Sequence, residues 1–411
     1  MTINYEGFIK EPWDVVGLNA CNIFIGHYPL SAMVNMHKNI GYGHTRHLFI
    51  FTKEYLEYHY SARDLENIGR TFLEKMKNNR NYLDNIIKKT DEAYKILEKF
   101  SKKFNKINLE DEGTDDLIAL FHEVFNANLS HIGYSHLIEG IAYVINPMIE
   151  NALRKVLEER GLEKNFNDYF TALAQPIKPS FVDKANISML KIAKSISKSG
   201  KDMEVIKRNG NFAELSEENK KLIEEHTAEY FWIRINYLSG EPLTEKDFFE
   251  EAKDLIKKNI DYDEAIKKAE ELYAHNKKAK AKIIKELKLR KDFLALLEIA
   301  DKNMYWQDER KEIMLKCIYY MGLIIKELAK RYMVSFSSAK QLLPTEINKD
   351  ILDDMDKSEL KKRAEKCVVL FQRDEKKGIM ETKVLVGNEC DDFIAMFRRK
   401  EEKRINNAII I

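Results

Sequence analysis

The sequence predicts a mostly α-helical protein with a small mixed α/β segment at the amino end and a ββα appendage at the carboxyl end. The 411 residues include only 16 Gly and 7 Pro, and 33% of them are charged beside 44% that are hydrophobic. This mixture is typical of long amphipathic helices, whereas sandwiches and doubly wound sheets need more turn residues. A chain of this length can also bury a sizeable core. We expect an amino-terminal segment with a β-hairpin at 1–60, a multi-helix domain at 61–345 and the appendage at 346–411.

The hairpin is predicted by an aromatic alternation on either side of a polar turn. Phe49 and Phe51 precede the turn at 52–54, and Tyr58 and Tyr60 follow it. Alternation with period two indicates strands that bury one face. Ser61 and Asp64 then form a capping-box-like helix start. We expect the hydroxyl and the carboxylate to satisfy the first free backbone N–H groups of that helix.

Helical spacing dominates the middle of the chain. The Asn-rich break at 78–81 predicts a helical hairpin around it. The apolar run that opens at Thr114 predicts a central buried helix through about residue 145, with Pro147 restarting the helix and Gly161 ending it. Thr244 and Asp247 repeat the capping-box-like signal.

From residue 366 the pattern changes to short β-branched runs. The runs CVVLFQ and ETKVLVG flank the charged turn RDEKKG, and a short helix follows at 389–397. Such runs are typical of strands. They predict the ββα appendage.

Charge and motif content argue against several classes of function. Lys and Arg number 68 against 67 Asp and Glu, so there is no global field to attract nucleic acid or an anionic membrane. The basic runs at 361–366 and 398–404 are interleaved with acids, which favours solvated helical faces. No glycine-rich phosphate loop, nucleophile elbow or CxxC pair is found. No stretch approaches the roughly 20 apolar residues that span a bilayer. We expect a cytoplasmic protein without a nucleic-acid or membrane partner.

The histidines do not predict a metal centre. His131 and His136 are five residues apart on a predicted helix and so lie off a common face. His44 and His47 lie in a loop with no carboxylate or thiol cluster beside them. Hydrogen-bonded core or surface histidines are the expected alternative. We therefore predict neither a metal site nor a cofactor.

Two clusters are candidates for a substrate site. The segment HTAEYFWIRINY contains His226, Trp232 and Arg234, and MYWQDERKE contains Trp306 and Arg310. Arginine beside an aromatic ring can clamp an anion or stack on a ring. The alternative, which we favour on these residues alone, is that the arginines form ion pairs with Asp308, Glu312 or Glu229 beside packed tryptophans.

Six segments in order resemble the helical module of phosphoenolpyruvate synthase-related, dikinase-type phosphotransferases such as rifampin phosphotransferase. Together they cover most of residues 45–390, and their shared order carries the resemblance. They are FTKEYLEYHYSARDLENIGRTFLEKM, TALAQPIKPSF, EYFWIRINYLSGEPLTEKDF, LKLRKDFLALLEIADKNMYWQDERKEIMLKCIYYM, LLPTEI and CVVLFQRDEKKGIMETKVLVG.

The resemblance implies a part in phosphoryl transfer. In such proteins an ATP-grasp domain phosphorylates a histidine on a swivelling domain, and the helical module of rifampin phosphotransferase holds the acceptor. Neither the ATP-grasp motifs nor the carrier histidine is found here, so we expect an incomplete catalyst. The implied function is a substrate-binding or accessory component that works with separately encoded phosphohistidine-domain and ATP-grasp subunits. The alternative is a non-catalytic helical interaction or scaffold protein.

Residue chemistry assigns the expected roles at this acceptor site. Phosphoryl transfer needs an acceptor oxygen held in line, a base for its proton and cations for the phosphoryl oxygens. We expect His226 to act as the base, Arg234 and Arg310 to clamp the anion, and Trp232 and Trp306 to form the pocket walls around a small-molecule acceptor.

Overall fold

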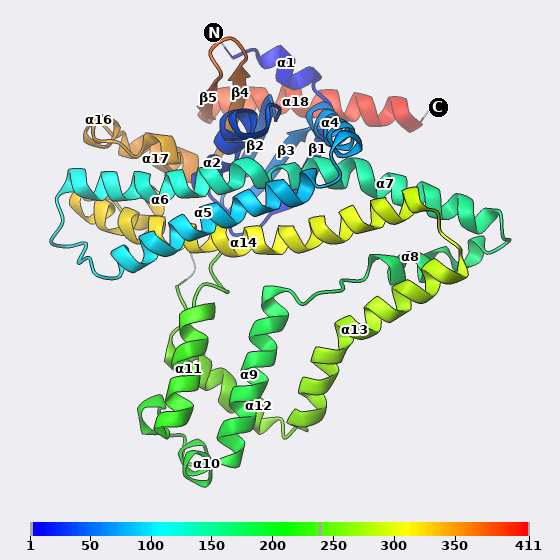
Figure 1. Ribbon diagram of the computed structural model, residues 1–411. Coiled ribbons are helices and arrows are strands. Elements are labelled where there is room, and N and C mark those ends of the chain that lie inside the picture. The colour runs from blue at the N-terminus through cyan, green and yellow to red at the C-terminus, as the bar shows by residue number, and fades with distance from the viewer. Residues whose placement is uncertain (1–2, 238–240, 410–411) are drawn as a thin grey trace. The chain divides into compact units, whose positions relative to one another are not determined.

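The protein is mostly α-helical, as predicted, with one small antiparallel sheet built from both ends of the chain (Figure 1). The computed structural model describes residues 3–237 and 241–409. The sheet has the strand order β1-β3-β2-β4-β5. Its strands are β1 (Trp13–Leu18), β2 (Arg46–Thr52), β3 (Tyr55–Ser61), β4 (Lys366–Asp374) and β5 (Ile379–Val386).

Strand β2 forms both the predicted hairpin and the junction between the chain ends. It pairs with β3 so that Phe49 lies opposite Tyr58, and Lys53 in the turn has a positive φ of 56°. On its other side β2 pairs with β4, where Phe49 lies opposite Val369. The two strands predicted near the carboxyl end therefore extend the sheet of the amino-terminal hairpin. Strand β1, which adds the opposite edge, was not predicted.

The two faces of the sheet have different cover. One face packs against α1 (Tyr5–Lys10) and α18 (Gly387–Ile409). The other face contacts the short helical segments that precede β2; Gly26 there lies against Phe371. The cluster under α1 and α18 consists of Phe8, Leu48, Ile50, Val368, Leu370, Leu385, Cys390, Phe393 and Phe397.

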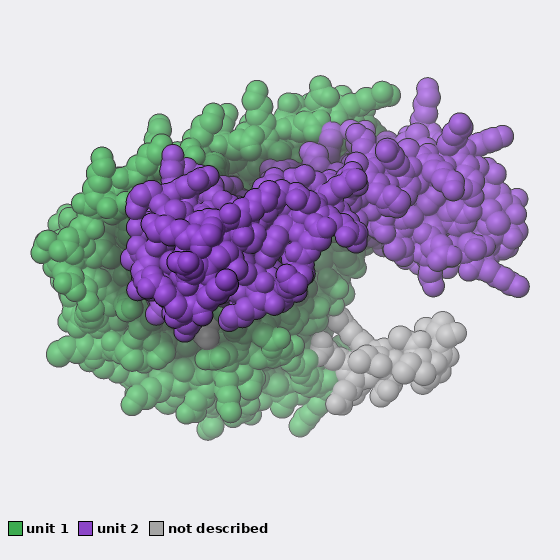
Figure 2. Space-filling model, turned by 90° about the horizontal axis from the view of Figure 1, so that it is seen from below, with its two compact units in different colours: residues 1–144, 236–239, 316–411 green, residues 145–235, 240–315 purple. Residues whose placement is uncertain are grey.

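The chain divides into two compact units, which Figure 2 shows in green and purple. Unit 1 comprises residues 1–144, 236–239 and 316–411, and unit 2 comprises residues 145–235 and 240–315. The segment boundaries expected near residues 60 and 345 fall inside unit 1. The helices α7 (Leu137–Glu158) and α14 (Lys291–Arg331) contribute residues to both units.

Unit 1 combines the sheet with helices from both ends of the chain. The Asn-rich break falls between α4 and α5, where it was predicted. Besides α1 and α18 its helical elements are the 3₁₀-helix η1 (Ile23–Gly26), α2 (His27–Leu30), the π-helix η2 (Ser31–Asn35), α3 (Met36–Ile40), α4 (Ala62–Asn78), α5 (Tyr82–Phe104), α6 (Thr114–Ser135), α15 (Phe336–Ala339), the 3₁₀-helix η5 (Pro344–Glu346), α16 (Lys349–Asp353) and α17 (Lys357–Glu365).

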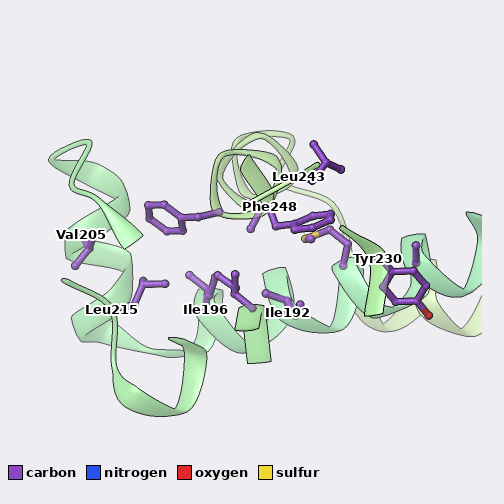
Figure 3. Close-up of a cluster of buried hydrophobic side chains, with 12 residues drawn as sticks. Ile192, Ile196, Val205, Leu215, Tyr230, Leu243 and Phe248 are labelled. Atoms are coloured by element: carbon purple, nitrogen blue, oxygen red, sulfur yellow. The ribbon is translucent and has the colours of Figure 1, made fainter. Parts of the chain in front are cut away.

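Unit 2 has its own hydrophobic core (Figure 3). Its largest buried members include Phe248 and Phe249, which pack against the helix that contains Ile192 and Ile196. Two of its helices start with complete capping boxes, at Ser180 and at the predicted Thr244. Its elements are the 3₁₀-helix η3 (Glu163–Asn165), α8 (Phe166–Ala174), α9 (Phe181–Lys198), α10 (Gly200–Lys207), the 3₁₀-helix η4 (Phe212–Glu214), α11 (Glu217–Tyr230), α12 (Glu245–Lys257) and α13 (Tyr262–Glu286).

The expected central helix is interrupted at a different residue from the one predicted. The break between α6 and α7 falls at His136, and Pro147 lies inside α7. Pro147 is exposed, and so is Tyr143, whose carbonyl loses its helical partner. Because water can satisfy that carbonyl, the proline does not end the helix. Gly161, with φ of 68°, follows the end of α7 at Glu158.

The first turns of α7 are central to unit 1, as predicted for this helix. Leu137 and Ile141 are 0% and 1% exposed. Gly140 lies against Gly69 of α4, where a methyl group added at Gly69 would lie 2.3 Å from the Gly140 carbonyl oxygen. The two glycines therefore let the helices approach more closely than side chains would permit.

Truncation of these side chains tests this position. Leu137→Ala or Ile141→Ala should lower the free energy of unfolding by about 2–5 kcal/mol, because each removes buried methyl groups and leaves a cavity. Urea denaturation of the purified protein measures the change. Tyr143→Ala, at a side chain that is 39% exposed, is the control and should cost less. Unmoved midpoints in both core variants would contradict the central position of α7.

Candidate functional site

All five residues predicted for the substrate site lie in unit 2. His226 is on α11, and Trp232 and Arg234 follow the end of that helix. Trp306 and Arg310 lie four residues apart on α14, so they share one helix face. The contacts of each residue decide which of them can face a ligand.

His226 is buried and neutral at pH 7. It is 4% exposed, and its Nδ1 lies 2.9 Å from the Ser188 hydroxyl oxygen of α9. The ring meets Phe248 edge to face, with 4.5 Å between the ring centroids. Burial lowers the pKa of His226 to about 4. A neutral imidazole is the form that can accept a proton.

Trp232 and Arg234 have local partners. The indole N–H of Trp232 donates to the Glu229 carbonyl oxygen at 2.7 Å, and its ring lies 5.0 Å from that of Phe181. The Arg234 side chain is 63% exposed and forms an ion pair with Glu251 at 3.1 Å. Arg234 thus forms the kind of ion pair that the alternative interpretation expected, although the partner is none of the three predicted carboxylates.

Trp306 and Arg310 are both buried, at 1% and 7% exposure. Within the described part of the chain, no acceptor lies within hydrogen-bonding distance of the Trp306 indole N–H. A buried donor without a partner is costly, because it loses its bonds to water and gains none in return. This donor is the clearest sign of an incomplete polar environment at the predicted site.

Two lysines and the Glu309 carboxylate lie around Tyr305, the neighbour of Trp306. The ammonium groups of Lys178 and Lys184 lie 4.5 and 5.8 Å from the Tyr305 ring centroid. Burial raises the pKa of Asp308, and the nearby Asp183 carboxylate adds to the rise. Neither lysine was among the predicted site residues, although Lys178 lies in TALAQPIKPSF, one of the segments that carry the family resemblance.

A second polar cluster lies in unit 1 and was not predicted. We call His44, His47 and His136 the imidazole cluster. The ring centroids of His44 and His47 are 4.6 Å apart, and those of His44 and His136 are 5.9 Å apart. Tyr60 of β3 meets both His44 and His47, at 5.9 and 5.2 Å. Three elements contribute these histidines: the loop before β2, β2 itself and the junction of α6 with α7.

The histidines of the imidazole cluster are fully buried. His44, His47 and His136 are each 0% exposed. No described group lies within hydrogen-bonding distance of either ring nitrogen of His44 or of His47. Burial, with a smaller contribution from His37, lowers the pKa of His44 to about 3. Burial and then the neighbouring His44 and His136 lower the pKa of His47 well below its ordinary value.

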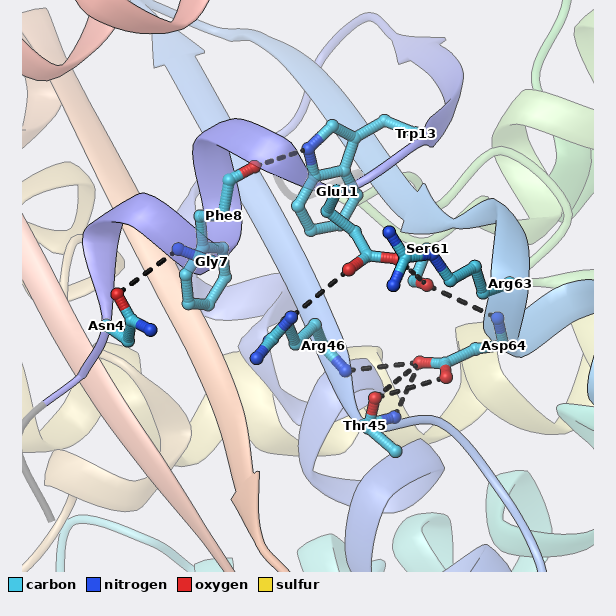
Figure 4. A network of polar contacts seen from close by, with 10 residues as sticks. All are labelled: Asn4, Gly7, Phe8, Glu11, Trp13, Thr45, Arg46, Ser61, Arg63 and Asp64. Atoms are coloured by element: carbon cyan, nitrogen blue, oxygen red, sulfur yellow. Dashed lines mark hydrogen bonds and ion pairs between the residues drawn. The ribbon is translucent and has the colours of Figure 1, made fainter.

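The loop that carries His44 is held by two buried carboxylates (Figure 4). Asp64 accepts hydrogen bonds from the backbone N–H groups of Thr45 and Arg46, at 2.6 and 3.2 Å, and from the Thr45 hydroxyl. Glu11 accepts from the Arg46 guanidinium at 3.1 Å and from the Ser61 hydroxyl at 2.8 Å. Only half of the expected capping box therefore forms: the Ser61 hydroxyl accepts from the Asp64 N–H, while the Asp64 carboxylate holds the loop.

The imidazole cluster depends on contacts that spacing along the chain does not reveal. His47 is buried because β2 is an internal strand of a sheet that is covered on both faces. Spacing along one helix relates His136 only to His131, whereas its spatial neighbour His44 comes from 92 positions earlier in the chain. The one usable signal was the HxxH of the GYGHTRH loop next to an aromatic strand.

Two features are absent from the described residues. Among them, no three His, Cys, Asp or Glu side chains are arranged to hold a metal ion. The described helices include none that is both long enough and apolar enough to cross a bilayer. No protein family model and no curated protein matches the chain.

The Asp64 contacts predict a stability difference between two substitutions. Burial raises the pKa of Asp64 to about 6, against the hydrogen bonds that favour the ionised form. Asp64→Ala should lower the free energy of unfolding by about 2–4 kcal/mol at pH 7, because it leaves the N–H groups of Thr45 and Arg46 without an acceptor. Asp64→Asn keeps one acceptor oxygen and avoids a buried charge, so it should cost less. Urea midpoints measure both, and equal losses would contradict the role of Asp64 as an acceptor for the loop.

Proposed function

We propose that the protein is a substrate-binding or accessory component of a dikinase-type phosphotransferase and is incomplete as a catalyst alone. It would hold a small-molecule acceptor while separately encoded ATP-grasp and phosphohistidine-domain subunits supply the phosphoryl group. The observation that carries this proposal is the buried indole N–H of Trp306, which has no described acceptor and lies on the same helix face as Arg310.

The residues around Trp306 suit an anionic or phosphorylated ligand. Arg310 can offer paired N–H donors to phosphate or carboxylate oxygens, and burial strengthens such bonds. Lys178 and Lys184, beside Tyr305, add positive charge in the same unit. The indole N–H would supply one further directed donor, as in pockets where a few polar groups orient a ligand among apolar walls.

The other three candidate residues differ in the contacts that they already make. His226 is neutral at pH 7, the form that a general base requires, but its pKa of about 4 makes it a weak base. Trp232 serves as an apolar wall, because its N–H is used by the Glu229 carbonyl. Arg234 contributes least to an anion clamp, since its exposed side chain already pairs with Glu251.

The alternative function is a non-catalytic helical interaction or scaffold protein. The ion pair between Arg234 and Glu251 favours it, because that contact is what helix packing without a ligand produces. Under this alternative the environment of Trp306 is purely structural. Ligand binding that depends on the indole N–H distinguishes the two functions.

The isolated protein should neither hydrolyse ATP nor become phosphorylated by ATP or phosphoenolpyruvate. The reason is that the sequence contains no recognisable phosphate loop, ATP-grasp region or carrier histidine. Incubation with each donor labelled with ³²P, followed by electrophoresis under conditions that preserve phosphohistidine, measures phosphorylation. Label retained on a histidine would contradict the incomplete-catalyst proposal.

Titration calorimetry with inorganic phosphate and with phosphoenolpyruvate tests the site. Trp306→Phe keeps the aromatic packing and removes the N–H, so affinity should fall about tenfold, the effect of one buried hydrogen bond. Arg310→Met should reduce it further, by roughly a hundredfold, because a charge-assisted bond is lost.

The matched control is Trp13→Phe in unit 1, whose indole N–H donates to the Phe8 carbonyl oxygen at 2.9 Å. It should leave anion affinity unchanged. If the parent protein binds neither anion, or if Trp306→Phe binds as the parent does, the assignment of an anionic acceptor to Trp306 is wrong.

A further inference from the structure

We propose that the imidazole cluster, together with His27, couples proton uptake to release of the segment 23–45 from the sheet, so that unit 1 opens locally on mild acidification. The segment comprises η1, α2, η2, α3 and the loop that contains His44. This inference is independent of the proposed acceptor site, which lies in unit 2.

The segment is a series of short turns that hold together mainly by burial. A 3₁₀-helix, an α-helical turn, a π-helix and another short α-helix follow one another without a long regular helix. Its polar contacts to the surroundings are spread over a few residues. Ser31 donates to the Leu129 carbonyl oxygen at 2.8 Å, and Arg373 donates to the Met33 carbonyl oxygen. The Tyr42 and Tyr82 hydroxyls lie 3.2 Å apart, and Thr45 at the end of the segment bonds to Asp64 and to the Arg373 N–H. Segments built this way are candidates for local opening below the free energy of global unfolding.

Three buried histidines lie on this segment or on the strand beneath it. His27 and His44 lie on the segment, and His47 lies on β2 beneath it. They are 1%, 0% and 0% exposed. A proton added to any of them in the closed state would place a charge in a buried layer. The rings of His44 and His47 neighbour each other, and the ring of His27 neighbours that of Tyr28.

The charged and titratable groups around these histidines come from every neighbouring element. Phenols are neutral in the acidic range, so they do not compensate an imidazolium charge. The Glu139 carboxylate, 3.8 Å from His136 Nδ1, would compensate part of such a charge. The facing groups are His37 of α3, Tyr28 of α2, Tyr58 and Tyr60 of β3, Asp64 of α4, His136 and Glu139 at the α6–α7 junction, and Arg373 and Glu375 at the end of β4.

The direction of the response follows from linkage. The closed state lowers the pKa of His27 to about 4 and that of His44 to about 3 through burial, and lowers the pKa of His47 as well. In the open state each histidine would titrate near 6.5. The closed state is therefore favoured above pH 6.5, and this preference is lost as the pH falls toward the closed-state values.

Asp64 opposes the histidines over part of this range. Its pKa is raised from 3.8 to about 6 in the closed state, so opening below pH 6 would release one proton there. Three protons taken up and one released leave a net uptake of at least two between about pH 6 and pH 4, because burial also lowers the pKa of His37 on the same segment. The opening equilibrium should then rise about a hundredfold per pH unit in that range.

Hydrogen–deuterium exchange with mass spectrometry on the full-length protein tests the proposal between pH 7.5 and 5.0. After correction for the intrinsic pH dependence of exchange, peptides from 23–45 should gain exchange steeply on acidification, before peptides from α5 and α6 do so. His47→Gln is neutral at all pH values and removes one titrating group, so the slope should fall to about tenfold per pH unit. His27→Gln should have the same effect and serves as the second variant if His47→Gln does not fold.

The control is His275→Gln, at an exposed histidine of α13 in unit 2, which should leave the slope unchanged. The proposal is overturned if the His47→Gln and His27→Gln variants both show the same slope as the parent protein. Exchange that rises at the same pH throughout unit 1 would also overturn it. The same holds for an acid response that disappears after a chelator has removed tightly bound divalent metal.

Discussion

The double pairing of strand β2 is the constraint on which unit 1 depends. β2 pairs with β3 from its own hairpin and with β4 from more than 300 positions later in the chain. Such pairing fixes the register on both sides, and a slip by one residue would turn every side chain of β2 to the opposite face. His47 and Phe49 would then point toward α1 and α18, and Leu48 and Ile50 toward the helices on the other side. Closure of this long loop costs entropy, which burial on both faces of the sheet must offset.

Two buried carboxylates extend this constraint from the strand to the loop before it. Asp64 and Glu11 are 6% and 4% exposed, and each accepts hydrogen bonds from residues that precede or begin β2. Burying a carboxylate is unfavourable unless its acceptors are used, and here backbone N–H groups, a hydroxyl and a guanidinium use them. Because Thr45 follows His44 directly, the same bonds hold that ring at the sheet.

The elements that the sequence predicted are those whose signals are local. The hairpin at Lys53, the two carboxyl-terminal strands and the capping box at Thr244 all follow from residues within a few positions of one another. The missed features depend on residues distant in the chain or on exposure. Strand β1 is an exposed edge with little hydrophobic pattern, and Pro147 is tolerated only because its side of α7 faces water.

The candidate site divides in the same way. Trp306 and Arg310 were predictable as a pair because a four-residue spacing places them on one helix face. The partner of Arg234 was not, because Glu251 belongs to the next helix and only the packing of α12 brings it near. The imidazole cluster was beyond prediction by spacing, since its three histidines come from a loop, a strand and a helix junction.

Buried histidines in the two units differ in whether their ring nitrogens have hydrogen-bond partners. In unit 2 the Nδ1 of His226 has a hydrogen-bond partner in Ser188, as buried polar groups usually do. His44 and His47 have none among the described residues and occupy a layer where phenylalanine or leucine would pack without an unsatisfied nitrogen. Stability alone therefore does not account for these imidazoles, because apolar residues of similar volume would avoid the desolvation cost. Buried imidazoles weaken such a layer only as the pH falls, which is the property that the proposed opening of the segment 23–45 requires.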